Sequence, residues 1–542
     1  MKITRLYHTV KYLKPIQITS RIWKKIHHPA IPVLAAPPRR TGADDTAQWC
    51  RRRPSMPGAS TFRFLNVEKT LTTRDDWQSL SSDKLWMYNL HYFDDLAADE
   101  ADSRTDWHRQ LIHRWIGECP PGMAVAWDPY PMSLRIVNWI KYLRRQEEPD
   151  AAVIESLATQ ARALRRNLEW HLLGNHLFAN AKALIFAGTY FSGDEADEWL
   201  RQGSKIMQAQ LSEQVLPDGG QFELSPMYHC ILLEDILDLI QLDRLYPDVL
   251  PASLSTQLQD CATRMLGWLE VMTRPNSEIV QFNDAAQGIA ATPDWLYAYA
   301  RRLRVQWQPL PQRALIHLPD TGYVRISSGE LTLFLDIAAI GPDYIPGHAH
   351  ADSLNFELHL RDEPVIVDSG TSIYGISDER HRQRTTSAHN TIEIDGLSSS
   401  EVWGGFRVAR RAHTTLDAMT ETPQISVSAH HNGYQTIAGK SIHQRQWTVG
   451  KDKVTIEDDL PGQFNRAVAR LHLHPEIKIE QTTPGRYMLT TAGNRQLSIS
   501  FKNGDNRLQE SSYHPEFGIS SPSCCIKAVL TDTKLTTEIR VV

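Results

Sequence analysis

The spacing of apolar residues changes partway along this 542-residue chain, and that change constrains the fold more than any other feature. From about residue 84 to 305, apolar positions recur at three- and four-residue steps, as amphipathic helices require. After residue 316, short segments alternate apolar and polar residues between glycines, prolines and aspartates, which is typical of an antiparallel sandwich. Helices first and strands second predict an α+β chain of two domains in series, with a cleft between them.

The expected boundaries follow from this pattern. We predict a basic arm and linker over residues 1–80, a helical domain over 81–310 and an antiparallel β-sandwich over 311–542. The Pro- and Arg-rich stretch from Pro37 to Pro57 is typical of a linker, and Pro293 suits the first turn of a helix. Strands are expected at Leu331–Asp336, Asn355–Leu360, Val365–Asp368, Asn390–Asp395, Lys453–Glu457, Ala467–His472 and Gln496–Phe501.

Charge is distributed unevenly. The formal net charge of −5 disfavours a nucleic-acid binder, yet residues 1–53 contain twelve Lys and Arg against only Asp44 and Asp45. Aromatic and aliphatic residues such as Trp23 and Ile26 lie between these cations, so the arm could lie on an anionic membrane surface. The alternative is a solvated arm packed against the next domain.

The sequence predicts neither an export signal nor a membrane-spanning segment. Lys11, Lys14 and Arg21 interrupt the start of the chain before a long apolar stretch forms, so no signal peptide is expected. There is no apolar run of spanning length, and the six cysteines show no CxxC spacing. We therefore expect a cytoplasmic or peripheral membrane protein with reduced thiols, a bacterial periplasmic location being the alternative.

The densest group of reactive residues is Gly347-His348-Ala349-His350-Ala351-Asp352. In an extended backbone His348 and His350 point the same way, because side-chain direction repeats every two residues. Asp368 ends an apolar segment further on, and His389 begins another. Two histidines and an aspartate from adjacent strands form a plausible zinc set, although spacing alone leaves open a trio of ordinary buried polar residues.

Two further groups lie in the helical half. Gly174-Asn175-His176 begins one helical segment, and Ser225-Pro226-Met227-Tyr228-His229 follows an Asp-Gly-Gly turn. Taken singly, Asn175 and His176 are ordinary polar residues, and Tyr228 is an amphipathic packing residue.

Together these motifs resemble the heparinase II/III-like polysaccharide lyases and their alginate-lyase relatives. The resemblance runs from Trp86-Met87-Tyr88-Asn89-Leu90-His91-Tyr92-Phe93 to Trp403-Gly404-Gly405-Phe406-Arg407, and includes Ala388-His389-Asn390-Thr391. It implies an incomplete (α/α) toroid followed by an antiparallel β-sandwich, in agreement with the periodicity.

The resemblance also implies catalytic roles. Asn175 would neutralise the substrate carboxylate with help from His348, while Tyr228 would be the principal proton-transfer residue and His176 a second base candidate. Tyr374 lies near the position of a second active-site tyrosine in some relatives, although the local match is loose.

The implied metal ligands are His350, Asp368 and His389, with zinc favoured and other divalent ions fitting nearly as well. Arginines surround His389, and Arg384 and Arg407 are candidates for binding substrate carboxylate or sulfate, because guanidinium groups bind such anions bidentately. The alternative for these arginines is a solvated basic loop.

The implied function is cleavage of a uronic-acid-containing, anionic polysaccharide or oligosaccharide by β-elimination, linked to exopolysaccharide or capsule metabolism. One rival is a glycoside hydrolase, for which Glu223 and Asp284 are the nearest paired carboxylates. A second rival is a non-catalytic polysaccharide-binding or assembly protein with the same fold.

Overall fold

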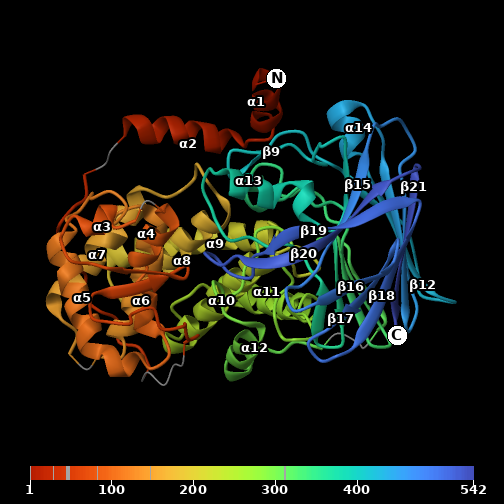
Figure 1. Ribbon diagram of the computed structural model, residues 1–542. Coiled ribbons are helices and arrows are strands. Elements are labelled where there is room, and N and C mark those ends of the chain that lie inside the picture. The colour runs from red at the N-terminus through yellow and green to blue at the C-terminus, as the bar shows by residue number, and fades with distance from the viewer. Residues whose placement is uncertain (1, 28–29, 44–48, 82, 147, 310–312) are drawn as a thin grey trace.

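The computed structural model describes all residues except 1, 28–29, 44–48, 82, 147 and 310–312. It has a helical half and a β half side by side, in the expected order, with a two-helix arm along the top of the view (Figure 1). The arm consists of α1 (Lys2–Val10) and α2 (Pro15–Ile26).

The helical half is an (α/α) toroid in which α6 packs on α8, α8 on α9 and α10 on α11. Polar caps fix where its helices begin: the Ser225 side chain accepts from the backbone N–H of Tyr228 to start α10, and Thr292 caps α12, which begins at Pro293 as predicted. In the described part of the chain no helix is long and apolar enough to cross a membrane. The helical segments are α3 (Asp76–Ser79), α4 (Lys84–Leu90), η1 (Asp94–Ala97), η2 (Ala101–Arg104), α5 (Thr105–Glu118), α6 (Pro129–Leu143), α7 (Ala151–Arg166), α8 (Gly174–Tyr190), α9 (Asp194–Gln214), α10 (Pro226–Leu245), α11 (Ala252–Val271) and α12 (Pro293–Arg302).

Residues 49–80 differ from the expected arm and linker. They contain a hairpin of β1 (Thr61–Phe64) and β2 (Val67–Thr70), and Trp49, Phe62 and Trp77 are buried in the toroid core. Burial of such large apolar side chains outweighs the local turn-forming composition, so this stretch belongs to the toroid.

The β half is an antiparallel sandwich. A sheet in the order β3-β4-β5-β6-β7 faces one in the order β11-β12-β13-β14-β21-β18-β17-β16, and side chains such as Leu333 and Trp447 share one core between them. A third sheet, β19-β20-β15-β8, lies beside them. The strands are β3 (Leu315–Leu318), β4 (Tyr323–Ser328), β5 (Leu331–Asp336), β6 (Phe356–Leu360), β7 (Glu363–Ile366), β8 (Ile392–Ile394), β9 (Val402–Trp403), β10 (Arg407–Val408), β11 (Thr414–Thr420), β12 (Ile425–His431), β13 (His443–Val449), β14 (Lys453–Asp459), β15 (Ala467–His472), β16 (Lys478–Thr483), β17 (Arg486–Thr490), β18 (Gln496–Lys502), β19 (Gly504–Tyr513), β20 (Ser521–Leu530) and β21 (Lys534–Val541). Short helices η3 (Pro346–His348), α13 (Asp378–Arg384), η4 (Thr386–Ala388) and α14 (Gly433–Ala438) lie in its loops.

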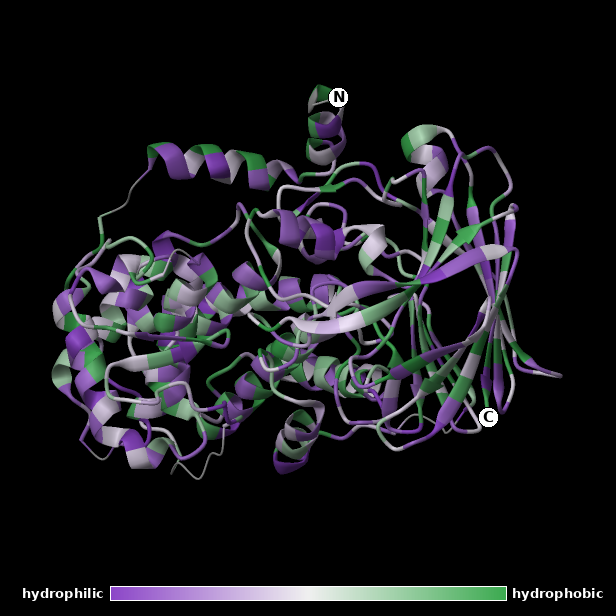
Figure 2. Cartoon of the chain, in the orientation of Figure 1, coloured by the Kyte–Doolittle hydropathy of each residue, from purple (hydrophilic) through white to green (hydrophobic). Residues whose placement is uncertain are grey.

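The two halves share a buried junction. Trp268 of the toroid packs in one apolar cluster with Tyr323 and Phe334 of the sandwich, and the Tyr323 hydroxyl donates to the Leu224 carbonyl at 2.6 Å. Figure 2 shows hydrophobic residues in green here, around α10 and α11. This contact fixes the two walls of the cleft relative to each other.

Candidate active site

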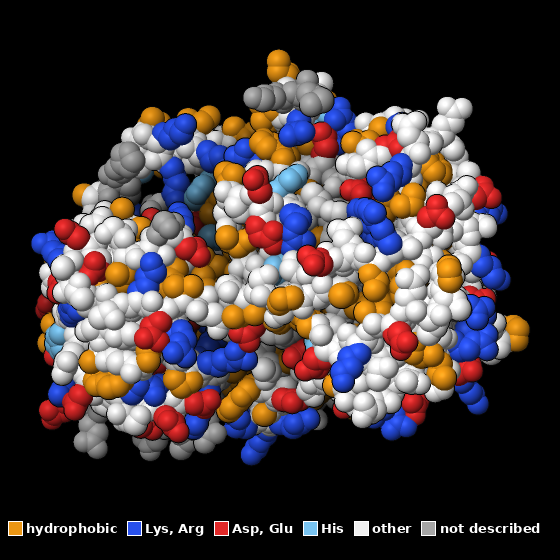
Figure 3. All heavy atoms as spheres, viewed as in Figure 1, with side chains coloured by type: hydrophobic (Ala, Val, Ile, Leu, Met, Phe, Trp, Pro, Cys, Tyr) orange, Lys and Arg blue, Asp and Glu red, His pale blue; other side chains and the backbone are white. Residues whose placement is uncertain are grey.

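A cavity of about 800 Å³ lies where the two halves meet. Asn175, His176 and Tyr228 line it from the toroid, and His348 and Tyr374 line it from loops of the β half. Figure 3 shows a hollow in the surface below α2 in which histidine side chains, in pale blue, are visible. The structure therefore brings together the catalytic residues that the family resemblance implied, including the loosely matched Tyr374.

The first turn of α8 presents Asn175 and His176. Gly174 has a φ of +53°, and a side chain there would meet Glu223 Oε1 at 3.2 Å, so glycine permits this close approach. His176 Nδ1 lies 3.1 Å from Oε1 of buried Glu169. Burial opposes ionisation of Glu169, but His176 and the hydrogen bonds hold its pKa below the usual value. The carboxylate therefore orients the ring and, with the proton on Nδ1, leaves Nε2 as an acceptor.

Tyr228 lies at the centre of the cleft wall. Its hydroxyl is 3.3 Å from that of Tyr374, and its ring centroid is 4.0 Å from that of His348. Burial first, and the neighbouring Tyr374 second, raise the pKa of Tyr228 well above its usual range. The resting form is therefore the protonated phenol, which can donate a proton.

Asp284 holds the loop that carries the two histidines. His348 Nδ1 lies 2.9 Å from one of its oxygens and His350 Nε2 lies 2.8 Å from the other. Arg380 donates to both oxygens at 2.5 and 2.6 Å. Burial opposes the charge, but Arg380 and the histidines hold the pKa of Asp284 well below its usual value. Asp284 is thus a buried anionic anchor.

This geometry argues against the hydrolase alternative. Glu223 Oε2 lies 3.6 Å from His348 Nε2, so Glu223 and Asp284 flank one imidazole ring. Asp284 is fully buried behind that ring and is paired with Arg380. A glycosidase instead needs two carboxyl groups facing each other across the scissile bond.

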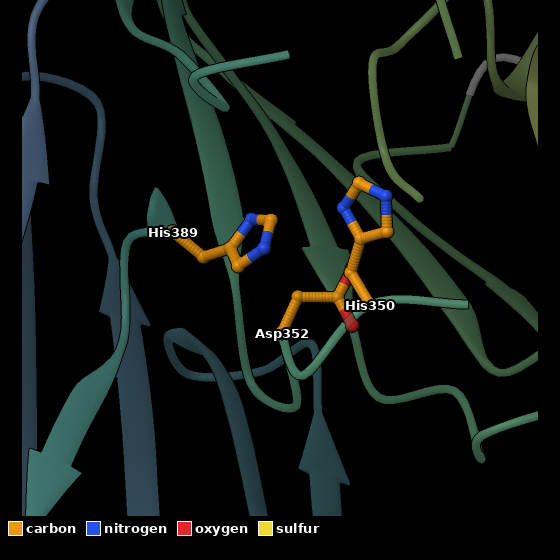
Figure 4. Close-up of side chains that lie close together, drawn as sticks. All are labelled: His350, Asp352 and His389. Carbon is orange, nitrogen blue, oxygen red and sulfur yellow. The ribbon is translucent and has the colours of Figure 1, made fainter. Parts of the chain in front are cut away.

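A second group, His350, Asp352 and His389, is suited to hold a metal ion. One ligand atom from each lies within 4.8 Å of the others, and Figure 4 shows His389 approaching from the opposite side to His350 and Asp352. His350 Nδ1, Asp352 Oδ2 and His389 Nε2 are buried without a hydrogen-bond partner among the described residues. Burial lowers the pKa of His350 to about 4, which keeps its ring neutral near neutral pH, as metal binding requires. The donor set fits zinc or a similar divalent ion.

Asp368 lies beside this group but does not offer a free oxygen to it. Its Oδ2 accepts from His389 Nδ1 at 2.7 Å and from Asn355 at 2.6 Å, and its Oδ1 accepts from the Gly370 N–H at 2.9 Å. In this arrangement Asp368 orients His389, and Asp352 has the unpartnered carboxylate oxygen beside the two histidines. The ligand role that the resemblance implied for Asp368 stays a prediction, and Asp352 is a further candidate for that position.

Neither predicted arginine reaches the cavity. Arg384 is buried and donates to the Ala349 carbonyl at 2.8 and 3.2 Å. Arg407 is exposed and its guanidinium lies 4.7 Å from the Trp403 ring centroid. The expected substrate contacts of both residues are therefore not supported, and Arg384 braces the histidine loop instead.

Sequence reasoning missed two residues of the site. Asp352 follows His348 and His350 at the same two-residue step, and that spacing could have identified it. Glu169 lies in a segment without a recognisable motif, and only the fold brings it to His176.

Two family models match the chain: Heparinase II/III N-terminus over residues 77–307 and Heparinase II/III-like, C-terminal over residues 310–541. A heparin-sulfate lyase of Bacteroides stercoris is 25% identical over 269 residues, which cover 46% of this chain and 40% of that protein. A heparin-sulfate lyase of Pedobacter heparinus is 26% identical over 246 residues, which cover 41% of this chain and 36% of that protein. The chain thus matches less than half the length of these curated relatives.

Solved structures share the fold. The crystal structure of a heparinase III has a TM-score of 0.71 at 18% identity, covering 86% of this chain and 79% of that chain. The crystal structure of a heparan sulfate lyase from Pedobacter heparinus has a TM-score of 0.59 at 16% identity, covering 97% of this chain and 87% of that chain. Both support the toroid and sandwich described above.

Proposed function

The chain belongs to the heparinase II/III-like family, and from this premise we propose that it is a polysaccharide lyase that cleaves a uronic-acid-containing polysaccharide by β-elimination. The observation that carries the proposal is the convergence of Asn175, His176, Tyr228 and His348 on one cavity. Exopolysaccharide or capsule material is the proposed natural source of the substrate. The heparin-sulfate lyases that match the chain support the anionic polymer class.

Elimination begins with a weakly acidic C5–H bond next to a carboxylate. Donors aimed at that carboxylate stabilise the enolate-like state as charge develops, which is the logic of an oxyanion hole. The Asn175 amide supplies one donor. The His348 ring, held through Nδ1 by Asp284, would supply the second donor from Nε2.

Proton transfer falls to two side chains in this proposal. His176, oriented by Glu169, takes the C5 proton on Nε2. Tyr228, whose raised pKa keeps it protonated, gives its proton to O4 as the C4–O4 bond breaks. The electron pair of the C5–H bond forms the C4=C5 double bond, so the products are an unsaturated uronate and a chain with a free O4 hydroxyl.

The buried donor set would hold a divalent ion, for which we propose zinc. His350, Asp352 and His389 would be its ligands. When bound, the ion supplies a rigid cross-link between the loops of the β half and needs no redox change. His350 then remains hydrogen-bonded through Nε2 to Asp284, which positions His348.

The purified chain should be incubated with a panel of uronate polysaccharides that includes heparan sulfate. A lyase product absorbs in the ultraviolet because of its C4=C5 double bond, so rising absorbance on one polymer is the expected result. Asn175→Ala should depress turnover and weaken substrate binding. New reducing ends without absorbance would instead identify a hydrolase and overturn the proposal.

A further inference from the structure

The arm helices expose an unusual number of large apolar side chains. Most of the exposed large hydrophobic residues in the described part of the chain lie between Ile3 and Leu34. Ile3 is 85% exposed, Ile22 is 58% exposed and Ile26 is 72% exposed. A contiguous exposed apolar surface of this kind marks an interaction site.

Both helices are amphipathic with the apolar face outward. In α1, Ile3, Leu6, Tyr7 and Val10 are exposed, whereas Thr9 is partly buried. The α2 stripe is Ile18, Ile22 and Ile26, spaced four residues apart on one side of the helix. A helix that serves only the core of its own protein has the opposite orientation, with apolar residues inward.

Polar contacts hold the helices in this orientation. In α1, Arg5 pairs with Glu401 at 3.3 Å, and the Thr9 hydroxyl accepts from the Trp403 indole at 3.2 Å. In α2, the Gln17 side chain is buried and donates to the Tyr344 carbonyl at 3.3 Å. The arm is therefore docked on the protein through its polar side, and its apolar side is left for another occupant.

Charge identifies the occupant. Residues 1–43 contain no Asp or Glu, and Arg21 and Lys25 are exposed beside the apolar stripe of α2. Trp23 is 56% exposed on the same helix, as suits an aromatic ring at a lipid headgroup boundary. A second copy of the arm would bring like charges together, and a soluble polyanion would leave the isoleucines in water.

We propose that α1 and α2 form a membrane-surface anchor that lies on a bilayer containing anionic lipids. The apolar face enters the headgroup–acyl boundary, and the flanking cations contact lipid phosphates. The hollow below α2 in Figure 3 then opens near the bilayer. Bound enzyme would thus act on polymer close to the membrane.

The full chain should be floated with vesicles of phosphatidylcholine alone and of phosphatidylcholine with phosphatidylglycerol. We expect salt-sensitive binding to the second vesicles and little to the first. Ile18→Asp, Ile22→Asp and Ile26→Asp combined should lower the partition coefficient by more than about 100-fold, because each fully buried Ile is worth about tenfold or more. Arg21→Gln and Lys25→Gln should each weaken binding about fivefold.

The matched control carries Val67→Asp, Met419→Asp and Leu508→Asp. These substitutions replace three exposed apolar residues outside the arm and add the same negative charge as the arm variant. It should bind vesicles within about threefold of wild type, since its added charges lie away from the arm. Near-ultraviolet circular dichroism and thermal melting will confirm that both triple variants fold. Equal binding by wild type and the arm variant would overturn the proposal. The proposal would also be overturned if the arm mediated dimerisation or polysaccharide binding while the protein did not bind vesicles.

Discussion

Tyr228→Phe separates catalysis from packing at the centre of the site. The substitution keeps the ring that lies 4.0 Å from the His348 ring and removes only the hydroxyl. The hydroxyl's recorded partner is the Tyr374 hydroxyl at 3.3 Å, which is long for a bond between two hydroxyls. The free energy of unfolding should therefore fall by about 1 kcal/mol or less.

Turnover should fall much further, because a general acid typically contributes about 10²–10⁴-fold. Initial rates of ultraviolet absorbance on a verified substrate, together with urea denaturation, measure both quantities. Tyr487→Phe is the matched control: its hydroxyl donates to Asn506 at 2.8 Å within the sandwich, away from the cleft. That variant should lose similar stability and keep its turnover.

A folded Tyr228→Phe protein with near-wild-type elimination would remove Tyr228 from the mechanism. Proton transfer would then rest on His176 alone. Loss of activity matched by a comparable loss of folded protein would equally contradict the assignment, because it would show that the hydroxyl acts in folding.

Three further predictions concern buried groups. Elemental analysis should find about one divalent ion per chain. Asp352→Asn should abolish metal binding, whereas Asp368→Asn should weaken metal affinity by about 10–100-fold. Equal losses of metal affinity in the two variants would contradict the proposed roles of these residues. Arg380→Met should lower the free energy of unfolding, measured by urea denaturation, by about 3–5 kcal/mol, and adding Asp284→Asn should restore part of that stability. A double variant as unstable as Arg380→Met would show that loss of the ion pair does not cause the destabilisation. Burial lowers the pKa of His91 to about 3. Because the unfolded chain takes up a proton on this histidine below about pH 6.5 and the folded chain does not, the free energy of unfolding falls as pH decreases below that value. His91→Asn should reduce the loss of unfolding free energy between pH 7 and pH 5 by about 2 kcal/mol. An unchanged dependence of the unfolding free energy on pH would refute this.

Sequence periodicity predicted the fold well where burial alone decides the structure. The segments Leu331–Asp336 and Ala467–His472 are strands with the predicted bounds. The strand predicted at Asn390–Asp395 is shorter, Ile392–Ile394, and at its start Asn390 binds the loops before β6 and after β7: its backbone N–H donates to the Asn355 side chain, and its side chain donates to the Phe356 and Val367 carbonyls. Such local polar competition is invisible to an alternation pattern.

The site was predictable only where its residues fall in one local motif. The motifs located Asn175, Tyr228 and His348, but not the ion pair between Asp284 and Arg380, which are 96 residues apart. No local spacing links these two residues. Their pairing depends on the toroid–sandwich junction, which forms only when both domains are folded.

Asp284 explains how two histidines separated by one residue take different roles. Its Oδ2 contacts His348, whose ring lies in the cleft, while its Oδ1 contacts His350, whose free Nδ1 belongs to the proposed metal set. The hydrogen bonds link the His350 ring to the Asp284 carboxylate and that carboxylate to His348, which stacks on Tyr228. An ion held by His350 would therefore restrain His348 through Asp284. Arg380 supplies the positive charge that keeps this carboxylate ionised while buried. Metal loss is therefore expected to act on catalysis through the position of His348.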